Sequence, residues 1–174
     1  IASCLVGSEM CIRDRTYGEG ISFLIPCYNE EETIEDTIKN VLNLEFPNKQ
    51  IIVINDGSSD DSEKVVSKLK EKLDFVFVNL EENNGKANAL NEGIKYATYD
   101  YVMGIDADTI IDEKAPYFMI ENFKKNSNLA AVTGNPRIRN KSSILGKIQT
   151  IEYASMVGSL SLIHISEPTR QEAI

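Results

Sequence analysis

Two aspartates separated by one alanine, Asp106 and Asp108, are the residues in this 174-residue chain whose type and spacing point most directly to chemistry. They follow an apolar, β-prone run, Tyr101–Ile105. Residues i and i+2 of an extended chain project from the same face, so both carboxylates can point into one site at the end of a strand. Two hard oxygen ligands with open positions suit Mg²⁺ or Mn²⁺ carrying a phosphate-bearing substrate. For an isolated Asp-x-Asp, the alternative is more common: Asp108 caps the next helix and Asp106 is a solvated strand end.

The elements that must position these aspartates alternate along the chain. Continuous apolar runs predict five strands, and 3.6-residue periodicity predicts helices between them. Such runs are typical of strands covered on both faces, and the alternation predicts an α/β fold with a doubly wound, mostly parallel sheet. The predicted strands are Ile21–Ile25, Ile51–Ile54, Phe75–Val78, Tyr101–Ile105 and Leu129–Thr133.

Local signals set the expected boundaries of these elements. Pro26 is expected to stop the first strand, since proline cannot donate to a sheet ladder. Asn29 with Glu32 is expected to cap the first helix, and Ser59 or Asp60 the second. The third helix is expected to bury one face, and a fourth is expected from about residue 113 to 125. The expected buried face of the third helix consists of Ala87, Leu90, Ile94 and Ala97.

Short polar residues and glycines follow each predicted strand, where parallel α/β sheets bind their ligands. Tyr28-Asn29, Asp56-Gly57-Ser58, Asn84-Gly85-Lys86 and Asp106-Ala107-Asp108 stand in these positions. Because the carboxyl ends of parallel strands meet at one sheet edge, these segments are expected to converge on one site.

Composition narrows the class of protein. A hydrophobic content of 42% and a charged content of 26% are ordinary for a folded globular domain. The net charge of −9 argues against a nucleic-acid partner. The sequence contains no run of about 18 apolar residues, so it predicts no membrane-spanning helix. The segment 144–159 has an amphipathic stripe that either packs on a core or lies at a membrane surface.

The two ends of the chain look like translated adaptor DNA. Leu160–Arg170 can be encoded by one DNA string whose opposite strand encodes Leu5–Asp14. Two unrelated protein segments have no reason to share such a string, which resembles a transposase-type sequencing adaptor. We therefore expect residues 1–15 and 160–174 to be non-native scars and residues 16–159 to be authentic. Cys27 is then the one authentic cysteine, so neither a disulfide framework nor a Cys/His metal site is supported.

Four blocks in order carry a resemblance to a known family. They are Ile25-Pro-Cys-Tyr-Asn-Glu30, Asn55-Asp-Gly-Ser58, Asn84-Gly-Lys-Ala-Asn-Ala-Leu-Asn91 and Asp106-Ala-Asp108. Together they resemble the family 2 glycosyltransferases, which have the GT-A nucleotide-sugar-binding fold. The resemblance covers nearly all of residues 16–159. Thr133–Asn140 and Gly146–Gln149 are similar, more narrowly, to bacterial synthases of poly-β-1,6-N-acetylglucosamine.

The resemblance implies a GT-A, Rossmann-like sheet that is truncated on its C-terminal side, and a role for each matching residue. Tyr28 and Asp56 would hold the uracil of a UDP-sugar, and Lys86 would lie against the nucleotide or its diphosphate. Asp106 and Asp108 would hold the nucleotide and a bridging Mg²⁺ or Mn²⁺. Pro26 and Glu30 belong to the same nucleotide-sugar-binding block. Arg137 and Arg139 either contact substrate or are solvated charges.

Inverting members of the family need a general base, supplied by a Thr-Glu-Asp motif, and processive members also carry Gln-x-x-Arg-Trp. Neither motif occurs here, and the family order places both beyond Ser159. The resemblance therefore implies the donor-binding half of an inverting transferase, inactive by itself, that uses a UDP-sugar such as UDP-N-acetylglucosamine and a glycan acceptor. The parent is expected at the cytoplasmic face of the bacterial inner membrane, with membrane helices and an unknown accessory subunit.

Other interpretations stay open at this point. Hyaluronan-, chitin- and cellulose-type synthases and single-addition enzymes share the donor half. A non-catalytic nucleotide-binding α/β module of Rossmann type belongs to a different class, but it would carry Gly-x-Gly-x-x-Gly where Pro26-Cys-Tyr-Asn29 stands. A receiver domain would need acidic residues directly after the first strand, where Tyr28 and Asn29 lie.

Overall fold

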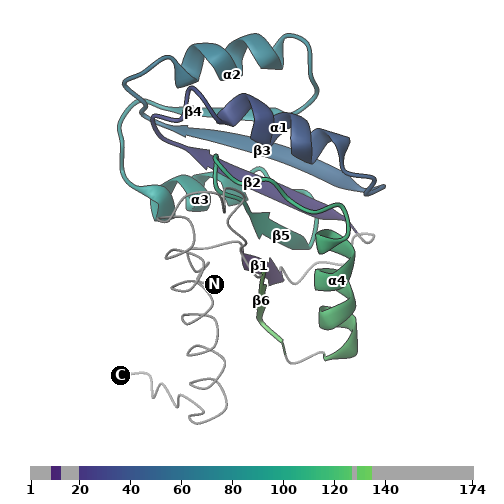
Figure 1. Ribbon diagram of the computed structural model, residues 1–174. Helices are drawn as coiled ribbons and strands as arrows, with labels where there is room; N and C mark the ends of the chain where they lie inside the picture. The colour runs from purple at the N-terminus through teal and green to yellow at the C-terminus, as the bar shows by residue number, and fades with distance from the viewer. Residues whose placement is uncertain (1–8, 13–19, 127–128, 135–174) are drawn as a thin grey trace, which may run out of the picture. The chain divides into compact units, whose positions relative to one another are not determined.

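The structure, a computed structural model, describes residues 9–12, 20–126 and 129–134 and shows an α/β arrangement (Figure 1). One sheet holds the strands in the order β4-β3-β2-β5-β1-β6. The strands are β1 (Glu9–Ile12), β2 (Ile21–Cys27), β3 (Lys49–Asp56), β4 (Val76–Leu80), β5 (Tyr101–Gly104) and β6 (Ala131–Thr133). The helices are α1 (Ile34–Asn43), α2 (Ser62–Lys70), α3 (Lys86–Ile94) and α4 (Ala115–Lys125).

Four neighbouring strands, β4, β3, β2 and β5, run parallel, which confirms the predicted doubly wound sheet. The strand β1 pairs antiparallel with both β5 and β6. Its residues fall within the segment 1–15 that the sequence predicts to be non-native. The sheet is thus mostly parallel with one antiparallel strand near its edge.

Helices cover both faces of the sheet, because side chains of the central strands alternate between two apolar cores. On β2, Phe23 and Ile25 enter the core that α1, α2 and α4 cover, whereas Leu24 enters the core beneath α3. On β3, Val53 and Ile52 divide in the same way. All five of these side chains are 0% exposed, so the central strands are closely packed on both faces.

Pro26 does not stop the first strand, as the sequence had led us to expect. The strand β2 continues through Pro26, whose register partner on β3 is Ile54, and ends at Cys27. The ladder between β2 and β5 ends earlier, at Leu24 and Gly104. The missing N–H of Pro26 therefore lies beyond the last β2–β5 pair, where a proline removes no bond from that ladder.

The expected helix caps are partly wrong. The helix α1 begins at Ile34 with Thr33 in the N-cap position, so Asn29 is not its cap. The helix α2 begins one residue after Asp61 rather than after Asp60. However, the Asp60 carboxylate still accepts a hydrogen bond from the Ser62 N–H at 3.0 Å. No side chain caps α1, and the N–H of Ile34 donates to the carbonyl oxygen of Glu30 at 3.0 Å.

The helix α3 buries a slightly different face from the one predicted. Ala89 and Leu90 are buried, Ile94 and Ala97 pack partly against the same core, and Ala87 is exposed. Within the part of the chain that the structure describes, no helix has the length and apolar character needed to cross a membrane. The segment 144–159, Arg137 and Arg139 lie outside the described residues.

Candidate functional site

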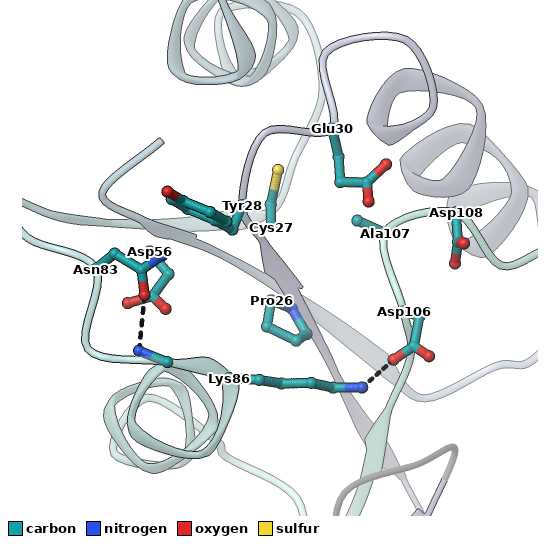
Figure 2. A pocket seen from close by; sticks show the side chains of 11 residues that line it. Pro26, Cys27, Tyr28, Glu30, Asp56, Asn83, Lys86, Asp106, Ala107 and Asp108 are labelled. Carbon is teal, nitrogen blue, oxygen red and sulfur yellow. Dashed lines mark hydrogen bonds and ion pairs between the residues drawn. The ribbon is translucent and has the colours of Figure 1, made fainter. Parts of the chain in front are cut away.

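A cavity of about 380 Å³ lies at the carboxyl ends of the parallel strands, where the sequence predicts a site (Figure 2). All seven residues predicted to bind a nucleotide-sugar or a metal line it, together with four that were not predicted. The lining residues are Pro26, Cys27, Tyr28, Glu30, Asp56, Asn83, Gly85, Lys86, Asp106, Ala107 and Asp108.

One end of the cavity combines an aromatic ring with a carboxylate and is here called the base end (Tyr28, Asp56 and Asn83) (Figure 2). Tyr28 follows β2 and is 46% exposed, so its ring is open to a ligand. Asp56 is the last residue of β3 and is 3% exposed. Its Oδ1 accepts the N–H of Asn84 at 3.1 Å. A flat base can stack on such a ring and donate an N–H to such a carboxylate.

A tight turn holds Asp56 against the loop that carries Asn83. Gly57 directly follows Asp56 and has a φ of +64°, which favours glycine. A Cβ at this glycine would lie 2.5 Å from the backbone nitrogen of Asn83. The backbones of the two loops therefore touch at a point where only a glycine fits, and this contact fixes one side of the base end.

The opposite end of the cavity, here called the acidic end, is formed by Asp106 and Asp108 just beyond β5 (Figure 2). The N–H of Thr109 donates to the carbonyl oxygen of Asp106 at 3.0 Å and so closes a turn around the pair. Asp108 does not cap a helix, since α4 begins at Ala115 after Lys114. The interpretation of this motif as a helix cap is therefore wrong, and both carboxylates are left for the cavity.

Lys86 connects the two ends of the cavity. It is the first residue of α3, and its side chain extends across the cavity so that its ammonium group pairs with Oδ1 of Asp106 (Figure 2). The Lys86 and Asp106 side chains are 34% and 47% exposed, so water reaches both. A lysine in this position is a mobile point charge that can pair with a carboxylate or with a phosphate.

The acidic end has a donor set that fits a hard divalent cation. Within residues 9–12, 20–126 and 129–134, no group of three or more His, Cys, Asp or Glu side chains is placed to hold a metal ion. Mg²⁺ and Mn²⁺ do not require such a group, because one or two carboxylates can share the ion with substrate phosphates and water. The pair Asp106 and Asp108 therefore fits a metal that arrives with, or is completed by, a phosphate-bearing ligand.

The remaining predicted residues form the rim and floor of the cavity. Pro26 lies between the two ends, and the Glu30 carboxylate points towards Ala107 (Figure 2). Glu30 is also fixed in place: its Oε2 accepts the Thr33 hydroxyl at 2.7 Å, and its N–H donates to Oγ of Ser62 at 2.9 Å.

Four lining residues, Cys27, Asn83, Gly85 and Ala107, were not predicted to bind a ligand, although Gly85 and Ala107 stand in segments expected to converge on the site. Asn83 could have been found, since it belongs to the Asn-Asn-Gly turn that also supplies Gly85. Ala107 lies between the two aspartates. Cys27 reads as a core residue, and it is one: it is 1% exposed, and burial raises the pKa of its thiol to about 11. No residue of the cavity is assigned as a general base. The sequence analysis expected that base beyond Ser159, which lies outside the described residues.

Comparison with known proteins relates the sequence of the chain to a family. The sequence model of "Glycosyl transferase family 2" matches residues 22–169. A poly-β-1,6-N-acetyl-D-glucosamine synthase from Staphylococcus aureus (strain COL) is 68% identical over 142 residues, which is 82% of this chain and 34% of the relative. The chain thus spans about a third of the length of the curated relatives it matches.

Solved structures share the fold. A mannosyltransferase from Pyrobaculum calidifontis in complex with GDP-Man and Mn²⁺ has a TM-score of 0.57 and 26% identity, covering 62% of this chain and 33% of its own. A glucosyl-3-phosphoglycerate synthase from Mycobacterium tuberculosis in complex with Mn²⁺, UDP and phosphoglyceric acid has a TM-score of 0.50 and 26% identity, covering 61% and 39%.

Proposed function

The chain belongs to glycosyl transferase family 2, and on that premise we propose that it forms the donor-binding part of an inverting, metal-dependent transferase that uses a UDP-sugar. The observation that carries this proposal is the cavity itself. It has a base end and an acidic end, and Lys86 lies between them. A nucleoside diphosphate has the same order of parts, with a flat base at one end and a diphosphate that binds metal at the other.

Each residue then has a role on this donor. Tyr28 stacks on the uracil, and Asp56 accepts its N–H. Lys86 leaves Asp106 and pairs with the diphosphate, while Asp106 and Asp108 hold the metal. When bound there, Mg²⁺ or Mn²⁺ neutralises charge on the diphosphate and so supports departure of UDP. The Mn²⁺ in the mannosyltransferase and synthase complexes supports this choice of ions.

We assign UDP-N-acetylglucosamine as the donor and a β-linked cell-surface polysaccharide as the product. The relative that is 68% identical over most of this chain is named for that polymer, which supports the assignment. The acceptor is then a growing glycan. By the same likeness, we place the parent protein at the cytoplasmic face of the bacterial membrane.

We further propose that the chain binds donor without turning it over. An inverting transfer needs a base that deprotonates the acceptor hydroxyl. The Thr-Glu-Asp motif that would supply it does not occur in the sequence. Sugar transfer from a UDP-sugar by the purified chain would contradict this part of the proposal.

Thermal unfolding tests the donor assignment. UDP with Mn²⁺ is expected to raise the Tm of the chain, because a ligand that binds only the folded state stabilises it. NAD is expected to leave the Tm unchanged. The variant Asp106→Ala/Asp108→Ala should lose the shift with UDP and Mn²⁺. An equal shift in this variant, or none in the wild-type chain, would count against the proposed function.

A further inference from the structure

A chain of hydrogen bonds joins the ends of three strands, next in sequence to residues of the base end. The N–H of Asn29 donates to Oγ of Ser58 at 3.0 Å, and the Ser58 hydroxyl donates to Oδ1 of Asn55 at 2.5 Å. The side-chain amide of Asn55 then donates to Oδ1 of Asn79 at 2.7 Å. These four residues, here called the polar relay, connect the ends of β2, β3 and β4.

Two residues of the polar relay are sequence neighbours of Tyr28 and Asp56, which form the base end. Asn29 directly follows Tyr28, and Asn55 directly precedes Asp56. Asn55 is 1% exposed, and its side chain both donates to Asn79 and accepts from Ser58, so it is held firmly in the sheet. A change in the distance between Asn29 and Asn55 would therefore shift the backbone that carries Tyr28 relative to the backbone that carries Asp56.

A second set of hydrogen bonds joins the same two loops. Oδ1 of Asn29 accepts the N–H of Ser59 at 2.8 Å and the Ser59 hydroxyl at 3.2 Å. The N–H of Glu31 donates to Asp60 at 3.2 Å, and the N–H of Asp61 donates to Glu31 at 2.8 Å. Asn29 thus uses both its backbone donor and its side-chain acceptor to bind the loop after β3.

Asn29 also holds a conformation that needs such support. Its φ is 55°, and among the residues that the structure describes it is the one non-glycine residue with a positive φ. Asparagine tolerates this left-handed region better than most residues, and fixed partners keep it there. Tyr28 is half exposed, so packing alone does not fix its ring, and the backbone of Asn29 directly after it limits where that ring can lie.

We propose that Asn29 and Ser58 are positioning residues that set the spacing of the base end and thereby the choice of base. This inference rests on the proposed function. Uracil presents an N–H at ring position 3, whereas cytosine presents its N–H on the exocyclic nitrogen. Asp56 can distinguish the two only if its carboxylate and the stacking ring are held at a fixed spacing. Neither Asn29 nor Ser58 lines the cavity, so both act through their neighbours.

Two variants are designed to weaken the hold on the spacing between Tyr28 and Asp56 while keeping both of these residues. Asn29→Gly keeps the positive φ but removes the side-chain acceptor. Ser58→Ala removes the hydroxyl that links Asn29 to Asn55. Asn29→Asp retains the acceptor and serves as the conservative rescue. Ser67→Ala, at an exposed position on α2, is the matched control for the loss of a serine hydroxyl.

The experiment measures Kd by titration calorimetry for UDP, CDP and pyrophosphate, each with Mn²⁺, on the full 174-residue chain. For Asn29→Gly and Ser58→Ala we expect UDP affinity to fall about fivefold to tenfold, the effect of losing one well-made hydrogen bond. The ratio of UDP to CDP affinity should fall as well. Pyrophosphate affinity should stay unchanged, because the acidic end is not touched, and a general loss of folding would lower all three affinities.

The outcomes separate this inference from the proposed function. If the wild-type chain binds UDP and the two variants keep the UDP-to-CDP ratio, the polar relay does not position the base end and the inference is wrong. The same conclusion follows if Asn29→Asp behaves like Asn29→Gly, or if pyrophosphate affinity falls in parallel with UDP affinity. If the wild-type chain does not bind UDP, the proposed function fails and the inference fails with it.

Discussion

Replacing Lys86 with methionine separates the role of this residue in the free protein from its role on the donor. In the free protein Lys86 pairs with Asp106, and both side chains are more than a third exposed. Ion pairs of this kind contribute about 0–1 kcal/mol, because water screens them. The variant should therefore unfold at nearly the same denaturant concentration as the wild-type chain.

When the donor is bound, Lys86 contributes more free energy through its contact with the diphosphate. A hydrogen bond to a charged group contributes about 1.5–3 kcal/mol. At about 1.4 kcal/mol per factor of ten, its loss weakens UDP binding about 10- to 150-fold. Binding of Mn²⁺ without nucleotide should strengthen instead, because Asp106 no longer has a competing cation. Calorimetry with UDP and Mn²⁺, and with Mn²⁺ alone, measures both effects.

Lys39→Met is the matched control for Lys86→Met. Lys39 makes an exposed ion pair with Glu35 on α1 at 2.5 Å, and neither residue lines the cavity. The control loses the same charge and the same kind of contact, and it should leave UDP affinity unchanged. If Lys86→Met binds UDP as tightly as Lys39→Met does, Lys86 does not contact the diphosphate. A weaker affinity for Mn²⁺ alone in Lys86→Met would refute the exchange of partners at Asp106.

Three further predictions follow from close approaches and burial. Gly57→Ala should lower stability by about 1–3 kcal/mol in denaturant titrations and weaken UDP binding, since its Cβ would meet the backbone of Asn83. Gly93→Ala places a Cβ 2.7 Å from Ile54 and should cost about 1–3 kcal/mol, and Ile54→Val should relieve part of this cost in a double-mutant cycle. The raised pKa of Cys27, about 11 against 9.0 for a free thiol, means that folding favours the neutral thiol. The contribution of the neutral Cys27 thiol to stability is fully present below pH 9 and is lost as pH rises towards 11, so the stability difference between wild type and Cys27→Ala should shrink over that interval. In the folded chain, Ellman's reagent should not label Cys27 at pH 8, as a comparison with Cys27→Ala checks.

The sequence was sufficient to predict the strand ends that form the cavity. Continuous apolar runs such as Ile51–Ile54 predicted buried parallel strands, and the polar residues after them had to meet at one edge. This rule depends only on the direction of the strands. It therefore brought Tyr28, Asp56, Lys86 and Asp106 together without any knowledge of their contacts.

The sequence could not predict contacts that depend on the approach of two loops. Asn29 looked like a helix cap because capping is a local pattern, but its side chain binds Ser59, 30 residues away. Pro26 looked like a strand end because its pairing depends on where the neighbouring strand stops. The strand β1 lies in a segment predicted to be non-native, so it was left out of the predicted sheet.

The order of the strands suggests that the two ends of the cavity form at different stages of folding. Ile21 pairs with Lys49 on β3, 28 positions away, but with Tyr101 on β5, 80 positions away. Closing the longer loop costs about 0.9 kcal/mol more in entropy, so we expect the β2–β5 pairing, which brings the acidic end to the base end, to form after the β2–β3 pairing. A nascent chain can therefore pair β2 with β3 and build most of the base end before the ribosome has made Asp106. The carboxylates then join a surface that is already formed.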